Sequence, residues 1–402
     1  MNMNIKQRKI VLILIVICIL ILIAFSFYFL RIKLAKIEVS LSDNLEVEFN
    51  EKRRVSSFID EINGEIVDDY FVDTTKLGVK KVDFKYINDD NIRVSYSFDI
   101  NVVDTTPPLI WVNTSYSLPV GSDVDLEDTI LCGDNYDKRP KCSISGDYDL
   151  NTVGDYPLTY TAVDQSGNQT DEKFILKVHE VISDSSLGED NEKRTLFSDV
   201  VEKYKTDKTK VGIDISKWQK KVDFAKLKEA GVEFVIIRVG TTLGVGGEYV
   251  IDEQFVRNIK EANKYNVDVG LYFYSYASSV GSAKKDARWL IKTIKKYKIN
   301  LPIAFDWEDW SNFNSYHISF YDLSNIGISF MSELEKYGYD TMLYSSKNYL
   351  EKIWLETGYD IWLAHYTEQT NYQGKYKFWQ LCNNGVVDGI DGNVDIDIMY
   401  QE

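Results

Sequence analysis

Hydrophobic and polar residues follow three different patterns along this chain, and each pattern predicts a different kind of structure. Residues 10–30 form one unbroken apolar run. Between residues 37 and 178, apolar and polar residues alternate in short runs, which is typical of half-buried β-strands joined by turns. From residue 210 onward, short apolar runs alternate with longer segments of helical periodicity, which predicts β/α units.

The apolar run predicts a membrane span. Its 21 uncharged residues would form a helix about 31 Å long, which matches the thickness of a bilayer core. Lys6, Arg8 and Lys9 precede the run as in a signal peptide, but no A-x-A-like cleavage site follows it. We therefore interpret residues 1–36 as a cytoplasmic stub and an uncleaved transmembrane signal anchor. Basic residues flank the run on both sides, so charge alone does not decide its orientation.

The alternating region divides into two units, which we predict to be all-β sandwiches at residues 37–103 and 104–179. Residues 73–78 (DTTKLG) precede a strand-like run just as residues 149–154 (DLNTVG) do, which indicates an internal repeat. The second unit carries the segments DTTPPLIWV, GDNYD and TAVDQSGNQT. Through them it resembles the bacterial immunoglobulin-like domains of exported Gram-positive proteins, and the first unit resembles these domains only loosely. The resemblance implies that both units act as spacers.

The chain has four cysteines. Cys18 lies in the apolar run, and Cys382 is predicted to be a free, packed thiol. Cys132 and Cys142 bracket a turn-rich segment, where an exported domain can form a short disulfide. Two free thiols fit the same sequence, so both alternatives stay open at this point.

The net charge of −16 argues against nucleic acid as a partner, because a nucleic-acid binder needs a basic face. The charge is uneven: residues 37–209 carry 18 basic and 36 acidic residues, whereas residues 210–402 carry 22 and 26. Residues 180–208 are polar, and we predict a linker there that contains a short helix near residues 196–204.

The C-terminal part, residues 209–402, is predicted to be a TIM-like (β/α)5β3 barrel. The order of its elements implies a parallel sheet of eight strands that about five helices cover incompletely. In such barrels the active site lies at the C-terminal ends of the strands. The strand-like runs are 211–216, 234–240, 268–277, 301–309, 340–346, 360–366, 377–381 and 394–400.

Five acidic residues lie on strands whose ends would meet at one open end of the barrel, which we call the mouth. Asp214 is in the first strand, Asp306 and Glu308 end the fourth, and Asp395 and Asp397 are in the eighth. Residues two apart on a strand point to the same side, so the fourth strand should present a carboxyl pair whose pKa values are pushed apart. Such a pair suits the cleavage of a glycosidic bond. Any single acid at a strand end also suits the cap of a turn or a helix, but convergence from three strands favours a site.

Eight segments of the C-terminal part match one known family in order and spacing. They are GIDISKWQ, AGVEFVIIRVG, VGLYFYSYA, PIAFDWED, YGYDTMLYSS, IWLAHY, WQL and GIDGNVDIDIMY. Through these segments the chain resembles the family 25 glycoside hydrolases, or Chalaropsis-type lysozymes. The resemblance implies hydrolysis of the β-1,4 bond between N-acetylmuramic acid and N-acetylglucosamine. Residue by residue, it implies Glu308 as general acid, Asp306 as the partner of the reacting acetamido group, and Asp214 and Asp395 as further site acids.

Several other residues are candidates for substrate contacts. Aromatic rings at strand ends can stack on sugars, although each of them also suits the barrel core. Arg238 either balances the acidic mouth or holds a structural ion pair. Lys220 and Lys221 replace the Gly-Asx turn that the family often has, which affects the rim and substrate details. The aromatic candidates are Tyr274, Tyr344, Trp362, Tyr366 and Trp379.

The sequence therefore predicts a membrane-anchored peptidoglycan hydrolase of a Gram-positive bacterium, with the N-terminus cytoplasmic and the bulk of the chain extracellular. The alternative is a cell-wall-binding surface protein without catalysis. Attack by the substrate's own acetamido group and attack by water with inversion both remain open. We expect no cofactor and no metal, since His179, His317 and His365 lack metal-binding spacing. The expected partners are peptidoglycan glycan strands and the membrane, and the sequence identifies no protein partner.

Overall fold

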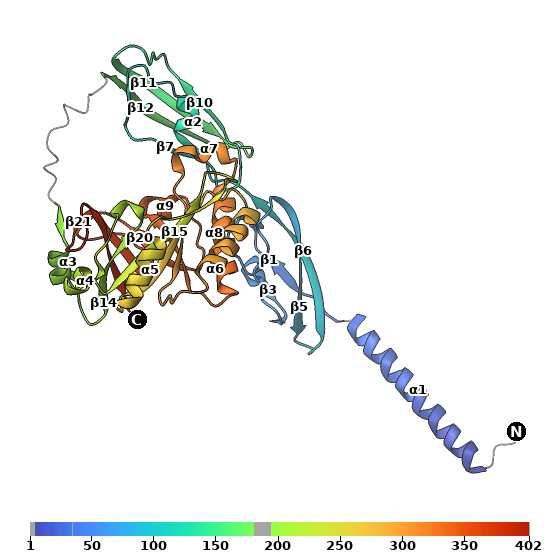
Figure 1. Cartoon of the computed structure of the whole chain (residues 1–402). Coiled ribbons are helices and arrows are strands. Elements are labelled where there is room, and N and C mark those ends of the chain that lie inside the picture. Colours follow the sequence, from blue (N-terminus) through green and yellow to red (C-terminus); the bar gives the residue numbers. More distant parts are fainter. Residues whose placement is uncertain (1–4, 34, 181–193, 402) are drawn as a thin grey trace. The chain divides into compact units, whose positions relative to one another are not determined.

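The computed structural model describes residues 5–33, 35–180 and 194–401 (Figure 1). The chain divides into two compact units, residues 1–105 and 106–402. Residues 181–193 of the predicted linker lie outside the described residues.

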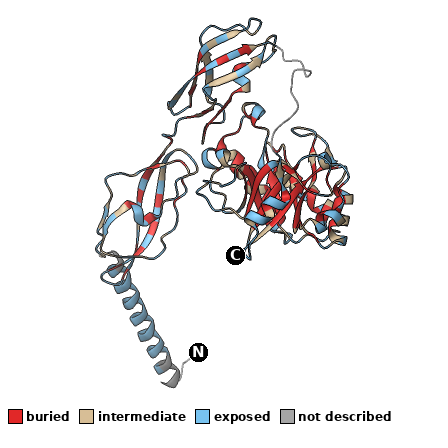
Figure 2. Ribbon diagram, turned by 90° about the vertical axis from the view of Figure 1, so that its left-hand side faces the viewer, coloured by how far each residue is buried: buried red, intermediate tan, exposed pale blue. Residues whose placement is uncertain are grey.

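Helix α1 (Ile5–Lys33) contains the apolar run. Its segment Val11–Arg31 is long and apolar enough to cross a membrane, and none of it is buried inside the protein (Figure 2). Leucine, isoleucine and phenylalanine side chains are exposed on all of its faces, as a helix surrounded by lipid requires.

The rest of the first unit is a small all-β structure. A four-stranded sheet has the order β2-β6-β5-β4, and β1 pairs with β3 in a second sheet. Along β5, Val82, Phe84 and Tyr86 are buried while the residues between them are exposed, which is the predicted alternation. The elements are β1 (Val39–Leu41), β2 (Glu46–Glu48), η1 (Val55–Phe58), β3 (Ile59–Ile62), β4 (Gly64–Ile66), β5 (Gly78–Asn88) and β6 (Arg93–Val103).

The second β-rich part, residues 106–180, repeats this arrangement. Its four-stranded sheet has the order β8-β12-β11-β10, and β7 pairs with β9. In both sheets the first pair is parallel and the two that follow are antiparallel. The internal repeat is therefore visible in strand order and direction; the immunoglobulin-like class stays a prediction. The elements are β7 (Leu109–Trp111), β8 (Ser115–Pro119), α2 (Leu126–Thr129), β9 (Leu131–Gly133), β10 (Lys141–Ser145), β11 (Gly154–Val163) and β12 (Gln169–His179).

The cysteines occupy the positions that the sequence suggested. Cys132 and Cys142 form a disulfide that closes a short loop of the second β-rich part. Cys382 is a free and buried thiol, and Cys18 is exposed on α1.

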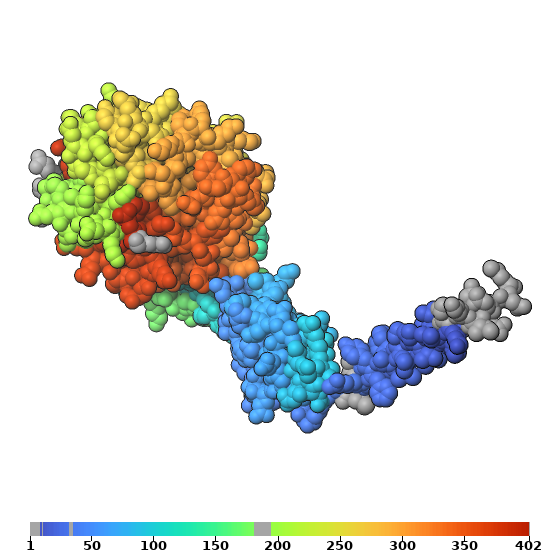
Figure 3. Space-filling model, turned by 90° about the horizontal axis from the view of Figure 1, so that it is seen from below, coloured from blue at the N-terminus to red at the C-terminus, as the bar shows by residue number. Residues whose placement is uncertain are grey.

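Eight strands close into a barrel in the second unit. They are hydrogen-bonded in the order β21-β20-β19-β18-β17-β15-β14-β22, and β22 also pairs with β21. The strands are buried along most of their length (Figure 2), and residues 195–400 follow one another around the unit (Figure 3). The strands are β14 (Thr209–Ile215), β15 (Phe234–Thr242), β17 (Asp268–Tyr274), β18 (Ile303–Asp306), β19 (Thr341–Ser346), β20 (Asp360–Ala364), β21 (Phe378–Val386) and β22 (Val394–Tyr400).

Helices separate the first six of these strands along the chain. Between β20, β21 and β22 the connections contain no helix in the described residues, so the helical cover is incomplete there. A short strand, β16 (Tyr249–Ile251), extends the sheet beside β15. The helices and 3-10 turns are η3 (Lys217–Gln219), α4 (Phe224–Glu229), α5 (Phe255–Lys264), α6 (Val280–Ile294), η4 (Trp310–Asn312), α7 (Phe313–Tyr316), α8 (Phe320–Glu335) and α9 (Lys347–Lys352).

The prediction of a parallel sheet is wrong for one strand. β22 runs antiparallel to both β14 and β21. Residues 387–393 connect β21 to β22, and such a short loop cannot carry the chain back to the far end of the barrel as a parallel crossover must. As a consequence, the beginning of β22 lies at the same end of the barrel as the C-terminal ends of its neighbours.

A strap precedes the barrel in sequence and packs on its outside. β13 (Thr195–Leu196) pairs with the end of β21, and α3 (Phe197–Tyr204) follows it. Phe197 and Val200 are buried in the outer core of the barrel, and Tyr204 contacts Trp379 edge to face. The short helix predicted at the end of the linker is therefore confirmed, and it belongs to the barrel's surface.

Candidate active site

The interior of the barrel is apolar in its lower part and acidic at its mouth. The apolar residues include Phe234, Ala304, Met342 and Met399. Because side chains alternate along a strand, the residue two positions beyond Ala304 also faces inward, and that residue is Asp306. The same alternation on the antiparallel β22 leads from Met399 through Asp397 to Asp395 at the mouth.

Asp214, Asp395 and Asp397 form one group of acids, on the neighbouring strands β14 and β22. Asp214 lies opposite Asp395 in the register of the two strands. Asp397 is fully buried, and its Oδ1 accepts a hydrogen bond of 2.8 Å from Nε1 of Trp362. Burial, followed by the charges of Asp395 and Asp397, raises the pKa of Asp214. Burial also raises the pKa of Asp395 to about 6, so this group retains protons well above the usual range of aspartic acid.

Asp306 and Glu308 form the second group. Asp306 is the last residue of β18 and is 3 % exposed, and its Oδ1 has no hydrogen-bond partner among the described residues. Burial and the charge of Glu308 raise the pKa of Asp306, while the Arg238 guanidinium lowers it. Glu308 is an exposed residue, but partial burial of its carboxyl group and the charge of Asp395 raise its pKa.

Asp306 and Glu308 do not lie on one strand, so the strand alternation that predicted them as a pair does not apply. β18 ends at Asp306, so Glu308 lies in the loop beyond the strand and strand alternation does not place it. The intervening Trp307 is fully buried, and its Nε1 donates to the carbonyl of Ala277 at 3.2 Å. The loop that follows continues into η4 and α7, so contacts of this loop determine where Glu308 lies.

The remaining predicted site residues divide between mouth and core. Tyr274 and Tyr344 lie opposite Asp306 in the register of β17, β18 and β19, and Tyr366 is 53 % exposed beyond β20. Trp362 faces the interior and bonds Asp397. Trp379 is 3 % exposed, and because it precedes the inward-facing Gln380 it points to the outer side of the barrel, against Tyr204 of α3.

Arg238 satisfies both of the interpretations that the sequence allowed. Its guanidinium forms an ion pair with Asp252, whose Oδ2 lies 2.8 Å from Nε and 2.7 Å from Nη2. The same positive charge lowers the pKa of Asp306. Asp252 thus fixes the position from which Arg238 acts on the mouth.

Sequence reasoning missed Gln380, which connects most of the mouth. Its Nε2 donates to Oδ2 of Asp214 at 2.7 Å, and its Oε1 accepts from Tyr344 at 2.9 Å and from Tyr366 at 3.2 Å. Its presence in the segment WQL, between two apolar residues of a buried strand, was the available signal, since a buried amide needs partners.

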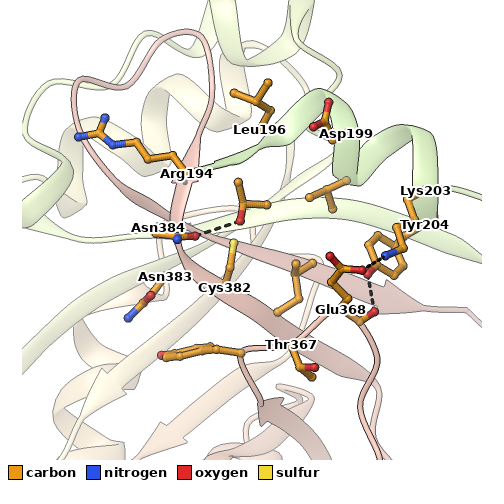
Figure 4. Close-up of a pocket in the computed structure, with 14 residues that line it drawn as sticks. Arg194, Leu196, Asp199, Lys203, Tyr204, Thr367, Glu368, Cys382, Asn383 and Asn384 are labelled. Atoms are coloured by element: carbon orange, nitrogen blue, oxygen red, sulfur yellow. Dashed lines mark hydrogen bonds and ion pairs between the residues drawn. The ribbon is translucent and has the colours of Figure 1, made fainter. Parts of the chain in front are cut away.

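A cavity of about 380 Å³ lies between the strap and the barrel (Figure 4). Tyr366 is one of its lining residues. The strap forms one wall, and the end of β21 together with the loop after β20 forms the other. The Lys203–Glu368 ion pair at 2.9 Å and a hydrogen bond of 3.0 Å from Thr195 to Asn384 join the two walls. The other lining residues of this cavity are Arg194, Leu196, Asp199, Val200, Tyr204, Thr367, Leu381, Cys382 and Asn383.

A barrel whose mouth holds several carboxyl groups with raised pKa values has the chemistry of a glycoside hydrolase, which needs one protonated acid beside an ionised one. Comparison with known proteins gives the family. Residues 213–390 match the sequence model of glycosyl hydrolases family 25, so this part of the chain is a domain of that family.

The curated relatives match less than half of the chain. The autolytic lysozyme of Clostridium acetobutylicum is 29 % identical over 189 residues, which is 46 % of this chain and 54 % of the lysozyme. The uncharacterized protein YegX of Escherichia coli strain K12 is 28 % identical over 195 residues, which is 46 % of this chain and 68 % of YegX.

Solved structures give similar matches. The autolysin LytC of Streptococcus pneumoniae, in complex with a synthetic peptidoglycan ligand, is 29 % identical with a TM-score of 0.44. That match covers 60 % of this chain and 56 % of LytC. A family 25 glycosyl hydrolase from Bacillus anthracis is 24 % identical with a TM-score of 0.41, over 50 % of this chain and 93 % of that protein.

Proposed function

We propose that this protein is a peptidoglycan hydrolase, specifically an N-acetylmuramidase that cleaves the β-1,4 bond between N-acetylmuramic acid and N-acetylglucosamine. The family 25 domain and the lysozyme among the relatives support this substrate class. The observation that carries the proposal is the pair at the end of β18: a buried Asp306 with one unpartnered oxygen, and next to it Glu308 with a raised pKa at the open mouth.

Glu308 is the general acid in this proposal. Burial and the charge of Asp395 favour its protonated form, so it still carries a proton where an ordinary glutamate has lost it. It gives this proton to the oxygen of the scissile bond as the bond to the anomeric carbon breaks. The leaving sugar thereby departs as an alcohol. Glu308 then accepts a proton from the incoming water, which restores the acid.

Asp306 is the partner of the substrate's acetamido group. Its unpartnered Oδ1 is an acceptor, and the acetamido N–H of the sugar is a matching donor. A hydrogen bond from that N–H holds the acetamido oxygen toward the anomeric carbon and stabilises the positive charge that the group gains when it attacks. Water then opens the cyclic intermediate, so the product keeps the anomeric configuration. Water attack with inversion is the alternative that the stereochemistry of the product distinguishes.

The location of the enzyme follows from its substrate. Peptidoglycan lies outside the cytoplasmic membrane, so helix α1 anchors the chain with the N-terminus inside and residues 35–402 outside. The length and composition of α1 support this anchoring. The two β-rich parts lie between the anchor and the barrel in sequence. A Gram-positive bacterium is the host that fits this arrangement.

Release of reducing ends from purified peptidoglycan tests the proposal. Glu308→Gln keeps the size and polarity of the side chain but removes the proton donor, and its rate should fall roughly 10²–10⁴-fold. Asp306→Asn should be severely impaired as well. Glu229→Gln, at an exposed position of α4, is the matched control, and circular dichroism checks folding.

The products and the wild-type protein separate this proposal from its rival. The new reducing end should be N-acetylmuramic acid. A folded wild-type protein that sediments with cell walls but releases no reducing ends would instead be a non-catalytic wall-binding protein. Near-normal activity of folded Glu308→Gln would remove this residue from its role as the acid.

A further inference from the structure

The second β-rich part (residues 106–180) contacts the barrel at the segment that follows Glu308 in the chain. That segment comprises η4, α7 and the first turn of α8, residues 310–322. Glu308 lies in the loop between β18 and η4, which we call the Glu308 loop. We propose that the second β-rich part is not a spacer but a fixed wall of the catalytic unit, and that this wall positions the Glu308 loop. This inference rests on the proposed function, because it assigns Asn314 and Trp111 as positioning residues for the same reaction.

Asn314 of α7 connects the two parts through hydrogen bonds. Its Nδ2 donates to the backbone carbonyls of Glu127 at 3.0 Å, Asp128 at 3.2 Å and Ile130 at 2.9 Å. Its Oδ1 accepts from the backbone N–H of Cys132 at 2.9 Å. The last backbone carbonyls of a helix lack hydrogen-bond donors within the helix. Asn314 supplies these donors to the C-terminal end of α2, although it lies almost two hundred residues away in sequence.

The loop closed by the disulfide supplies the reciprocal contacts. The first turn of α8 has backbone N–H groups without helical partners, and Phe320 donates one to the carbonyl of Asp134 at 2.8 Å. The side chains of Lys138 and Asp322 form an ion pair at 2.8 Å. Gly133 lies so close to the barrel that a Cβ atom there would be 2.6 Å from the ring of Phe320.

Aromatic rings continue the contact to the catalytic loop. Trp111 of β7 packs on Tyr349 with ring centroids 4.7 Å apart, and Tyr349 stacks on Trp310 at 4.0 Å. Trp310 in turn contacts Trp307 at 4.8 Å, and Trp307 stands between Asp306 and Glu308 in the chain. The charge of Glu308 is close enough to raise the pKa of Tyr349, after the larger effect of burial.

These contacts matter because the position of Glu308 is not fixed by the hydrogen bonds of a strand. The residue lies beyond the end of β18, in a loop whose visible anchors are Trp307, Trp310 and the short helix α7. An acid that is displaced by about 1 Å from the scissile oxygen loses much of its effect on the rate. Loosening the wall should therefore lower kcat and leave substrate binding at the open mouth nearly unchanged.

The test compares two pairs of variants of the full chain in detergent. Asn314→Ala removes the hydrogen bonds to α2, and its control is Asn325→Ala, whose side chain bonds Tyr321 of its own helix. Gly133→Ala forces the two parts apart, and its control is Gly154→Ala, where a Cβ would lie an ordinary 3.4 Å from the nearest atom. Each variant is measured for kcat and KM on soluble glycan strands, and for amide hydrogen exchange of residues 307–321.

We expect kcat of Asn314→Ala and Gly133→Ala to fall about tenfold, with KM within twofold of wild type and both controls near wild type. Hydrogen exchange in residues 307–321 should be about tenfold faster in the same two variants. Unchanged exchange and unchanged kcat in folded Asn314→Ala would overturn the inference, as would equal losses in the controls. If the wild type shows no hydrolysis, the proposed function fails, and the exchange measurement still decides whether the wall holds the loop.

Discussion

Asp395 allows a quantitative test of the electrostatics of the mouth. It is half-buried at the beginning of β22, opposite Asp214, and burial raises its pKa to about 6 from the model-compound value of 3.8, while the hydrogen bond with Asp214 opposes this shift. Asp395→Asn keeps the shape of the side chain and removes the ionisable proton. The substitution should therefore stabilise the protein, and by an amount that depends on pH.

The sign follows from where the proton is held. The folded protein keeps the proton of Asp395 to a higher pH than the unfolded chain does, so the carboxyl group contributes stability that is complete below about pH 4. That contribution is lost as the pH rises through about 6. With about 1.36 kcal/mol per pH unit, the cost of the ionised carboxylate is about 1 kcal/mol at pH 4.5 and about 3 kcal/mol at pH 7.5. These are upper values because water reaches part of the side chain.

Urea unfolding followed by tryptophan fluorescence measures this difference. All eight tryptophans lie between residues 111 and 379, so the signal reports on the second unit. The free energy of unfolding of Asp395→Asn minus that of wild type should increase by about 2 kcal/mol from pH 4.5 to pH 7.5. Any packing change is the same at both pH values and cancels. Asp391→Asn, an exposed position in the preceding loop, is the control. A difference that is constant with pH, or that decreases, would refute the reasoning.

Three further outcomes are expected. Gln380→Leu removes the hydrogen-bond donor to Asp214 and the acceptor of the Tyr344 and Tyr366 hydroxyls. Its kcat/KM on peptidoglycan should therefore fall at least tenfold while circular dichroism stays unchanged, and wild-type kinetics would contradict this role. The charge of Asp395 helps to raise the pKa of Glu308, so in Asp395→Asn the alkaline side of the pH–activity profile should shift to lower pH. An unshifted profile would show that the two groups do not interact. Protease added to intact protoplasts should degrade residues 35–402, and full protection would show that the proposed orientation is wrong.

Much of the architecture could be predicted from hydrophobic pattern alone. The uninterrupted apolar run specifies α1, and alternation specifies the long strands of both β-rich parts, because one face of each strand must be buried. The eight barrel strands also coincide with apolar runs. Asp306 could be placed at the mouth for the same reason, as the first polar residue at the end of a buried strand.

Tertiary structure decided the features that depend on partners distant in sequence. Gln380 connects Asp214 with two tyrosines from other strands, and no local pattern reveals those contacts. The direction of β22 followed from the length of one loop and the need to close the barrel. The pKa values of the acids depend on burial and on charges that only the closed barrel brings together.

Glu308 shows the division most clearly. The sequence determined that a second acid follows Asp306 by two positions, and family resemblance suggested its role. Its location is set beyond the strand, by Trp307 and Trp310 in the barrel, and in our proposal by Asn314 and the second β-rich part. A strand transmits its geometry only as far as its hydrogen bonds extend, and past that point the position of a side chain depends on what the folded chain packs against it.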